Sequence, residues 1–302
     1  MILCAGESLI DMVPQDGGFR PLAGGAVYNT AVALGRLGAN AGYLWPISTD
    51  PFGAMIRQPL ADAGVNTDLC PVTDRLTTLA IVTLTGTEAR YSFYDAESAG
   101  RMLRPDDIAP LPDTVAALFA GGISLVPDPC GATIETLIAQ NHARMAVMID
   151  PNIRPFFITE PEPYRARLSH LLPMADIVKL SADDLEWLYP DLSPDAAAQR
   201  VLQTGPRIVL QTGGESGARA IWAGDVVNVP AVRTTVADTI GAGDTFNAGV
   251  LASLSRQGVL TKSGLASVTP AQLRTALTMG AQAAAVTVSR PGANPPWAHE
   301  MP

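Results

Sequence analysis

A run of small residues that ends in a carboxylate, residues 238–246, carries the strongest chemical signal in the chain. Gly241 and Gly243 stand between a β-branched run at 229–236 and an alanine- and leucine-rich helical pattern at 247–255. This order predicts a strand that turns into a helix at the glycines. Unpaired N–H groups and the positive end of the dipole meet at such a helix start, and small residues let an anion approach the backbone. We therefore predict an anion site here.

A negative side chain at the edge of this anion site points to catalysis. Asp244 directly follows Gly241, Ala242 and Gly243. A pocket that only holds phosphate gains nothing from a carboxylate, whereas a site that deprotonates an attacking hydroxyl group needs a base. The alternative is structural: the glycines make a tight turn, and Asp244 or Thr245 caps the helix.

Polar residues near the N-terminus have the chemistry of a sugar site. Asp11 ends the first predicted strand, and Gly24, Gly25 and Asn29 open the helix that follows. Sugar hydroxyl groups need acceptors and donors at fixed positions, which a carboxylate, a close backbone and an amide supply. The alternative is an ordinary loop with Asn29 as the helix cap.

Two more polar motifs follow predicted strands. The proline-bounded loop at 150–155 presents Arg154, which could bind a phosphate or carboxylate through two bonds, or could pair with the aspartate of its own loop. The segment 179–184 offers Lys179, Ser181 and Asp184. A capping Ser181 before an acidic first helical turn explains the last two residues equally well.

Composition excludes several classes of function. The chain has 302 residues, a net charge of −9 and only two lysines, so no basic cluster could neutralise nucleic-acid phosphates. Neither lysine follows a glycine-rich loop, which excludes a Walker A motif. No apolar run reaches membrane-spanning length, the N-terminus does not have the pattern of a signal peptide, and the three cysteines lack metal-ligand spacing. We expect a cytoplasmic protein that contacts neither nucleic acid nor membrane.

The pattern of elements predicts an α/β fold. Strands and helices alternate after residue 115, which favours a parallel sheet with helices on both faces. Two β-rich runs, 77–84 and 89–94, indicate a hairpin whose turn lies at 85–88. Earlier segments predict a first strand at 2–13 interrupted by Gly6 to Ser8, a helix at 29–37, a strand at 41–47 and a helix at 52–63. Ligands bind beyond the carboxyl ends of such strands, where the polar motifs fall.

The motif at 238–246 closely resembles the C-terminal signature of the ribokinase-like sugar kinases, also called the type B phosphofructokinase family. Residues 24–29 resemble its first signature, with Val27 and Tyr28 in place of the usual Pro-Ala, and Trp45 and Ser48 also depart from the pattern. Residues 150–155 resemble a motif of bacterial fructokinases and of 2-keto-3-deoxygluconate kinases. Residues 289–296 resemble the C-terminal end of bacterial fructokinases. The motifs keep the family's order from Glu7 to Asn294.

The resemblance implies a ribokinase-like three-layer α/β/α fold, one domain over residues 1–302, with a mainly parallel sheet and a small β-sheet lid from segments about 9–23 and 76–98. Asp244 would be the catalytic base beside an anion hole at Gly241, Ala242 and Gly243. The sugar would contact Asp11, Gly24, Gly25, Asn29, Tyr94, Arg154 and Asp244. ATP would contact Lys179, Ser181, Thr212, Gly214, Gly217, Gly241, Gly243 and Asn247. Mg²⁺ would lie near Asp184 through water, and a monovalent cation such as K⁺ near the backbone of Asp238.

The implied reaction is transfer of the γ-phosphoryl group of MgATP to a sugar. Acid-sugar kinases of this family usually carry Tyr-Arg in the lid, where this chain has Tyr94-Asp95. Asp95 therefore favours a neutral ketohexose as the acceptor. The expected reaction converts fructose to fructose 6-phosphate. Asp11 opposes a sugar that is already phosphorylated. The alternatives are a 2-keto-3-deoxygluconate kinase, another sugar or nucleoside kinase, and a non-catalytic sugar-binding protein. Relatives often pair their lids, which implies a homodimer.

Overall fold

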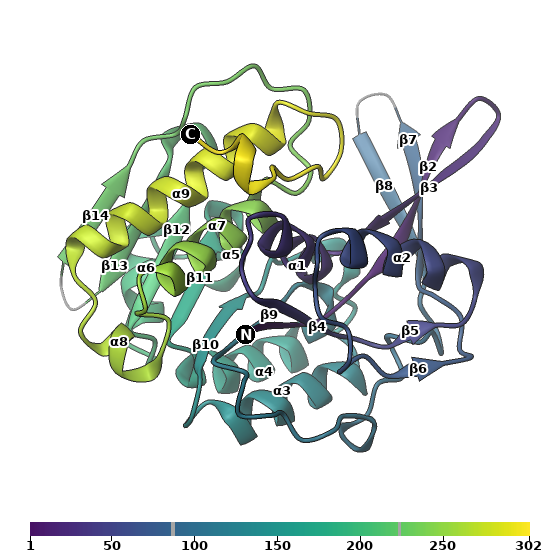
Figure 1. Cartoon of the computed structure of the whole chain (residues 1–302), viewed down its shortest axis with the longest axis horizontal. Coiled ribbons are helices and arrows are strands. Elements are labelled where there is room, and N and C mark those ends of the chain that lie inside the picture. The colour runs from purple at the N-terminus through teal and green to yellow at the C-terminus, as the bar shows by residue number, and fades with distance from the viewer. Residues whose placement is uncertain (86–87, 223–224) are drawn as a thin grey trace.

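A twisted eight-stranded sheet forms the centre of the computed structural model, which describes residues 1–85, 88–222 and 225–302. Its strands run in the order β14-β13-β12-β11-β10-β9-β1-β4, and the last six of these are parallel (Figure 1). The parallel strands are β1 (Ile2–Ala5), β4 (Ala41–Leu44), β9 (Ala117–Gly121), β10 (Ala146–Asp150), β11 (Ile177–Ser181) and β12 (Ile208–Thr212). The antiparallel edge consists of β13 (Ala218–Trp222) and β14 (Asp225–Val229).

Helices cover both faces of this sheet, which confirms the predicted three-layer α/β/α architecture (Figure 1). Crossovers between parallel strands are right-handed, so α1 (Ala26–Arg36), between β1 and β4, lies opposite the helices that connect β9 to β12. Helix α7 (Ala242–Arg256) packs against both α1 and α9 (Pro270–Val288). The connecting helices are α3 (Cys130–Asn141), α4 (Pro161–Leu171), α5 (Ala182–Leu188) and α6 (Pro194–Leu202), and α2 (Pro51–Asp62) and α8 (Lys262–Ala266) complete the set.

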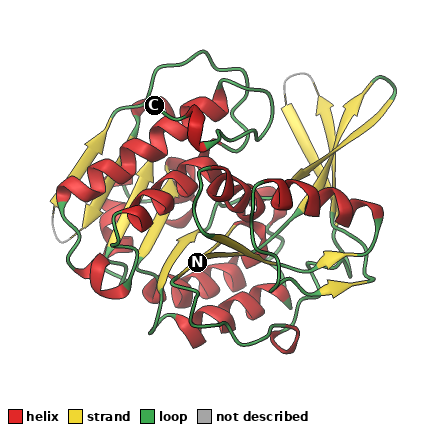
Figure 2. Ribbon diagram, in the orientation of Figure 1, coloured by secondary structure: helices red, strands yellow, loops and turns green. Residues whose placement is uncertain are grey.

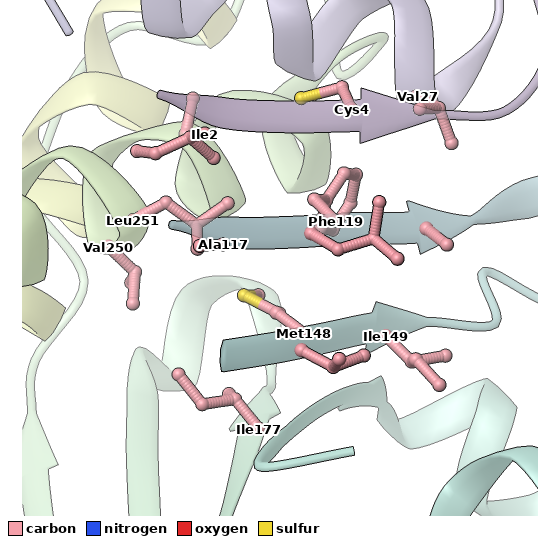
Figure 3. Packing of buried hydrophobic residues seen from close by; sticks show 14 of the residues in the cluster. Ile2, Cys4, Val27, Ala117, Phe119, Met148, Ile149, Ile177, Val250 and Leu251 are labelled. Carbon is pink, nitrogen blue, oxygen red and sulfur yellow. The ribbon is translucent and has the colours of Figure 1, made fainter. Parts of the chain in front are cut away.

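The central strands are apolar along their whole length because both of their faces are covered. Every residue of β1, β9 and β10 is buried, and Ile2, Phe119 and Met148 meet in the core (Figure 3). Val250 and Leu251 of α7 approach the same strands from the helical layer (Figure 3). This packing fixes the start of α7 relative to the ends of the strands.

A separate four-stranded sheet projects from one end of the molecule (Figure 2). It has the order β3-β2-β7-β8 and consists of β2 (Leu9–Gln15), β3 (Gly18–Gly24), β7 (Leu79–Thr85) and β8 (Glu88–Tyr94). We call it the lid sheet. The predicted small sheet and its hairpin are therefore confirmed, although residues 86 and 87 of the hairpin turn lie outside the described residues. A short two-stranded sheet pairs β5 (Ile47–Ser48) with β6 (Val72–Thr73), and β5 contacts α2.

Several predicted boundaries were wrong. The first strand is two strands in different sheets, because the chain leaves the core sheet after Ala5 and enters the lid sheet at Leu9. The β-branched run at 229–236 leaves its strand at Val229 and continues as a loop, so residue pattern alone overstated it. Strand 41–47 breaks at Trp45-Pro46, since proline lacks an N–H group for the ladder. None of the helices in the described ranges is long and apolar enough to cross a membrane.

Candidate active site

The glycine turn begins helix α7, as predicted. Gly241 is the N-cap and adopts the left-handed conformation, with φ of 78°. A side chain there would also come within 2.8 Å of Ala293 Cβ. Both the backbone conformation and this close contact therefore require glycine. The Ala242 amide donates to the Thr239 carbonyl at 3.3 Å, which takes it out of the predicted set of anion donors. The amides of Gly243 and Asp244 lie in the first turn, where a helix supplies no acceptor.

Asp244 is held in place at this helix start by helix α1. Its Oδ2 atom accepts a hydrogen bond from the Asn29 side-chain amide at 2.9 Å, and its backbone carbonyl accepts one from the Thr30 hydroxyl at 3.3 Å. Asn29 lies inside α1, whose N-cap is Gly25, so the alternative role of Asn29 as a helix cap was wrong. Burial raises the pKa of Asp244 to about 6, although the bond from Asn29 lowers it. The group is thus poised to exchange a proton near neutral pH.

A buried cation lies next to the anion donors. The Lys179 ammonium group contacts Asp150 Oδ2 at 3.0 Å, and a Cβ added to Gly243 would lie 3.4 Å from Lys179 Nζ. Burial lowers the pKa of Lys179, but the charges of Asp150 and Asp184 outweigh it, so the pKa is raised and the group stays charged. A fixed positive charge beside the α7 amides is suited to bind phosphoryl oxygens.

Asn247 joins the same cluster one turn into α7. Its amide donates to Asp150 Oδ2 at 2.7 Å, while its Oδ1 atom is buried without a partner among the described residues. A buried acceptor of this kind is ordinarily satisfied by water. Asn247 therefore offers a place for an ordered water beside Lys179 and Asp150.

Ser181 and Asp184 form a capping box at the start of α5. The Asp184 amide donates to Ser181 Oγ at 3.1 Å, and Asp184 Oδ2 accepts from the Ser181 amide at 2.7 Å. Asp184 Oδ1 accepts from the Ile153 amide, also at 2.7 Å. The structural alternative for both residues is thus present, and both carboxylate oxygens are occupied by protein donors. Within the described ranges, no group of three or more His, Cys, Asp or Glu residues could hold a metal.

The carboxylate of Asp11, in strand β2 of the lid sheet, is the candidate sugar contact on the lid side. No hydrogen bond to its side chain is present among the described residues, and burial raises its pKa to about 6. Gly24 lies against it, since an added Cβ would come within 2.6 Å of Asp11 Oδ2. The next residue, Gly25, begins α1. The structure therefore brings Asp11, Gly24, Gly25 and Asn29 to one side of the site.

The register of the lid sheet separates Tyr94 from Asp11. Asp11 pairs with Ala80 and Ala80 with Phe93, so these three residues share one face, while Tyr94 points to the other and is 66% exposed. Phe93 packs edge-on against Phe157 of the loop after β10, with ring centroids 4.7 Å apart. The lid residue on the site's side is thus Phe93 rather than the predicted Tyr94.

Asp95 directly follows β8 and is not a free negative charge. It forms an ion pair with Arg101 at 3.1 Å and accepts a hydrogen bond from the Thr78 hydroxyl at 3.0 Å. The prediction that Asp95 alone repels an acid sugar therefore left out its ion pair with Arg101. Arg154, by contrast, is exposed and donates to the carbonyl of Ile153 at 3.1 Å, which leaves it at the rim of the site.

The predicted nucleotide residues lie along the neighbouring strand ends. Thr212 ends β12 and pairs with Ser181 at the end of β11. Gly214 and Gly217 follow in a short 3₁₀ turn, both with positive φ. Asp238 connects the two C-terminal loops, because its Oδ1 accepts from the Ile240 amide at 3.0 Å and its Oδ2 from the Gly292 amide at 2.9 Å.

Sequence reasoning missed Glu7 and Arg101. Glu7 is buried between the start of α1 and the turn after β9, and its carboxylate accepts from the amides of Ala26 at 2.9 Å and Ser124 at 3.2 Å. Burial raises its pKa to about 7. Glu7 could have been found from the sequence because it is a charged residue within an otherwise apolar strand pattern. Nothing in the local pattern around Arg101 distinguished it from a surface arginine.

Comparison with known proteins identifies the arrangement. The family described as pfkB family carbohydrate kinase matches residues 1–300. A curated fructokinase of Rhizobium leguminosarum bv. trifolii is 43% identical over 279 residues, which cover 91% of this chain and 86% of that protein. The crystal structure of a fructokinase with bound ATP from Xylella fastidiosa is similar with a TM-score of 0.87 and 30% identity, covering 100% of this chain and 94% of the other. A Vibrio cholerae fructokinase double mutant in a form with bound fructose, ADP and potassium ion has a TM-score of 0.85 and 25% identity, covering 97% and 93%.

Proposed function

Because the chain belongs to the pfkB family of carbohydrate kinases, we propose that it transfers the γ-phosphoryl group of MgATP to the 6-hydroxyl group of D-fructose. The observation that carries this proposal is the position of Asp244. It lies buried at the start of α7, beside the first-turn amides, and bonded to Asn29 at 2.9 Å. A pure sugar-binding protein has no use for a base at an anion site, so this arrangement supports a kinase.

The mechanism follows from the residues around the reacting groups. Asp244 accepts the proton of the sugar hydroxyl group as the oxygen attacks phosphorus. The amides of Gly243 and Asp244, together with the Lys179 ammonium, stabilise charge on the transferring group. Most of the rate enhancement comes from positioning and electrostatics, since phosphoryl transfer needs little covalent chemistry from the protein.

Magnesium enters with the nucleotide as MgATP. Because both oxygens of Asp184 accept protein hydrogen bonds, this residue fits a role through water rather than direct coordination. Asn247 Oδ1, which has no partner in the part of the chain that the structure describes, lies beside Asp150 and fits such a water. Mg²⁺ ordinarily keeps several waters and is held mainly by substrate phosphates. When bound, the ion neutralises charge on the β- and γ-phosphates.

The lid sheet closes over the sugar and excludes water, which would otherwise compete as the acceptor. Asp11 and Phe93 share its inner face. The same sheet carries the proposed homodimer contact. A monovalent cation such as K⁺ is held by backbone carbonyls near Asp238, whose side chain joins the two loops involved. We place the enzyme in the cytoplasm, where MgATP is available.

The direct test of this function is ADP release with a panel of sugars. We expect turnover with D-fructose to exceed turnover with 2-keto-3-deoxygluconate, ribose or a nucleoside. ADP release with one of these other acceptors, but not with fructose, would change the assigned acceptor and leave the assignment as a kinase in place. Sugar binding by calorimetry without ADP release from any acceptor would favour a non-catalytic binder.

Asp11 provides a prediction specific to the sugar. The Asp11→Asn variant exchanges an acceptor for a donor in the lid, so we expect kcat/KM for fructose to fall by about tenfold to a hundredfold. The KM for ATP should change little, because Asp11 lies on the lid and not at the nucleotide strand ends. Steady-state kinetics with each substrate varied in turn measures the two effects. An equal rise in both KM values would show a general loss of structure.

The pH dependence of the free enzyme follows from Asp244. Its pKa of about 6 lies above the ordinary value of 3.8 because the group is buried. The base acts only when deprotonated, so kcat/KM should be level above this pKa and fall about tenfold for each pH unit below it. Asp11 titrates in the same range, with a pKa of about 6. The acid limb should therefore persist in Asp11→Asn, and its disappearance there would assign the limb to Asp11 instead.

A further inference from the structure

A second polar cluster lies in a cavity at the base of the lid sheet. Its polar lining comes from Glu7, Ser8, Thr78, Asp95, Arg101 and Ser124. Glu7 and Ser8 follow β1 and Ser124 follows β9, while the other three residues flank the lid strands β7 and β8. The chain crosses from β1 to β4 toward one edge of the sheet and from β9 to β10 toward the other, and ligands gather at the switch point between β1 and β9.

The cavity adjoins the sugar side of the active site. Thr78 directly precedes β7 and Asp95 directly follows β8, and the Thr78 hydroxyl donates to Asp95 at 3.0 Å. Its inner wall is formed by Glu7, whose carboxylate holds the first amide of α1 behind the Gly24–Gly25 turn. On the proposed function, on which this inference rests, the 6-hydroxyl group of the sugar meets Asp244, and we take the C1 end to lie toward this cavity.

Arg101 is presented to the cavity in a fixed orientation. Its Nη1 atom contacts Asp95 Oδ2 at 3.1 Å, and its Nε atom donates to the Asp128 carbonyl at 2.7 Å. Asp95 is fixed in turn by the hydroxyl groups of Thr78 at 3.0 Å and Ser98 at 3.1 Å. The Asp95 side chain is only 14% exposed and that of Arg101 35%, so the pair is partly shielded from water.

We propose that Arg101 and Asp95 together set the specificity for the C1 end of the sugar, with Asp95 masking the guanidinium against carboxylates. An arginine free in a cavity binds a carboxylate through two parallel hydrogen bonds. With Asp95 already on one edge, the pair is neutral, and a second carboxylate would meet a like charge. A hydroxymethyl group meets no such penalty and can accept from the remaining guanidinium donors.

The test uses two acceptors that differ only at C1, D-fructose and 2-keto-D-gluconate. The Asp95→Asn variant unmasks Arg101, so the ratio of kcat/KM for the acid to that for fructose should rise by about tenfold to a hundredfold. In Arg101→Gln, the carboxylate of Asp95 is left unbalanced, and the ratio should fall below that of the wild type. The double variant removes both charges and should return the ratio to within a few-fold of the wild type. Asp74→Asn, an exposed acid outside the cavity, should leave the ratio unchanged.

A merely structural role for the pair predicts a different result. If the ion pair only braces the lid, Asp95→Asn lowers kcat/KM for both acceptors alike and lowers the melting temperature without changing the ratio, and this outcome overturns the proposal. Calorimetry with the two acceptors measures the corresponding ratio of binding affinities, which does not depend on turnover. If the wild type releases no ADP with any sugar, the proposed function fails, and the binding ratio still decides the role of Arg101.

Discussion

We expect the Asp244→Ala variant to lose activity with fructose by about 10²–10⁴ in kcat while it retains nucleotide affinity. The loss follows because no other carboxylate takes the position bonded to Asn29 at the start of α7. Asp244→Asn keeps the shape and should lose nearly as much, since an amide accepts no proton at this pH. Steady-state rates together with ATP-analogue binding by calorimetry separate the two properties.

Asp183→Asn is the matched control for these variants. Asp183 is also an aspartate in the first turn of a helix, but it is exposed on α5 and forms no ion pair with the site residues in the described part of the chain. It should keep wild-type turnover. Near wild-type kcat in Asp244→Asn would mean that another group removes the hydroxyl proton, and the assignment of the base would be withdrawn.

The second large effect is expected at Lys179. Lys179→Met removes the buried cation 3.0 Å from Asp150 and next to Gly243. Loss of charge stabilisation at the phosphoryl group should lower kcat by about 10²–10³. Asp150 is then buried without its partner, so the free energy of unfolding should also fall, by about 3–5 kcal/mol. Kinetics below the unfolding transition and denaturant titration measure the two quantities.

The other lysine of the chain controls for the loss of an ion pair. Lys262 contacts the buried Asp176 at 2.6 Å, and Asp176 directly precedes β11, at the end of the strand opposite to Ser181. Lys262→Met should therefore reduce stability with kcat largely unchanged. Equal losses of kcat in the two variants would show that Lys179 acts through the fold rather than on the phosphoryl group.

The fold and the centre of the site could be predicted because their signals are local. Strand–turn–helix patterns such as the one ending in Asp244 carry their own geometry, and the alternation of elements after residue 115 indicates a parallel sheet. The resemblance of the short motifs then placed Asp11, Asn29 and the glycine turn in one site. The structure brings Asn29 and Asp244, which are 215 residues apart, into contact.

What could not be predicted depends on register and on long-range pairing. A shift of one residue along β8 decides whether Tyr94 or Phe93 faces Asp11, and the sequence pattern there is aromatic at both positions. The ion pair between Asp95 and Arg101 crosses a loop whose path has no sequence signature. The end of the strand at Val229 likewise depends on which residues find a pairing partner, because the β-branched run continues past it.

Phosphorus and carbon NMR of the product formed from D-fructose and MgATP tests the central claim most directly. We predict a phosphate ester on C6 of fructose, formed with one equivalent of ADP by the wild type and not by Asp244→Asn. Inorganic phosphate as the only new phosphorus signal besides ADP, or an unchanged spectrum with purified and folded enzyme, would contradict the account.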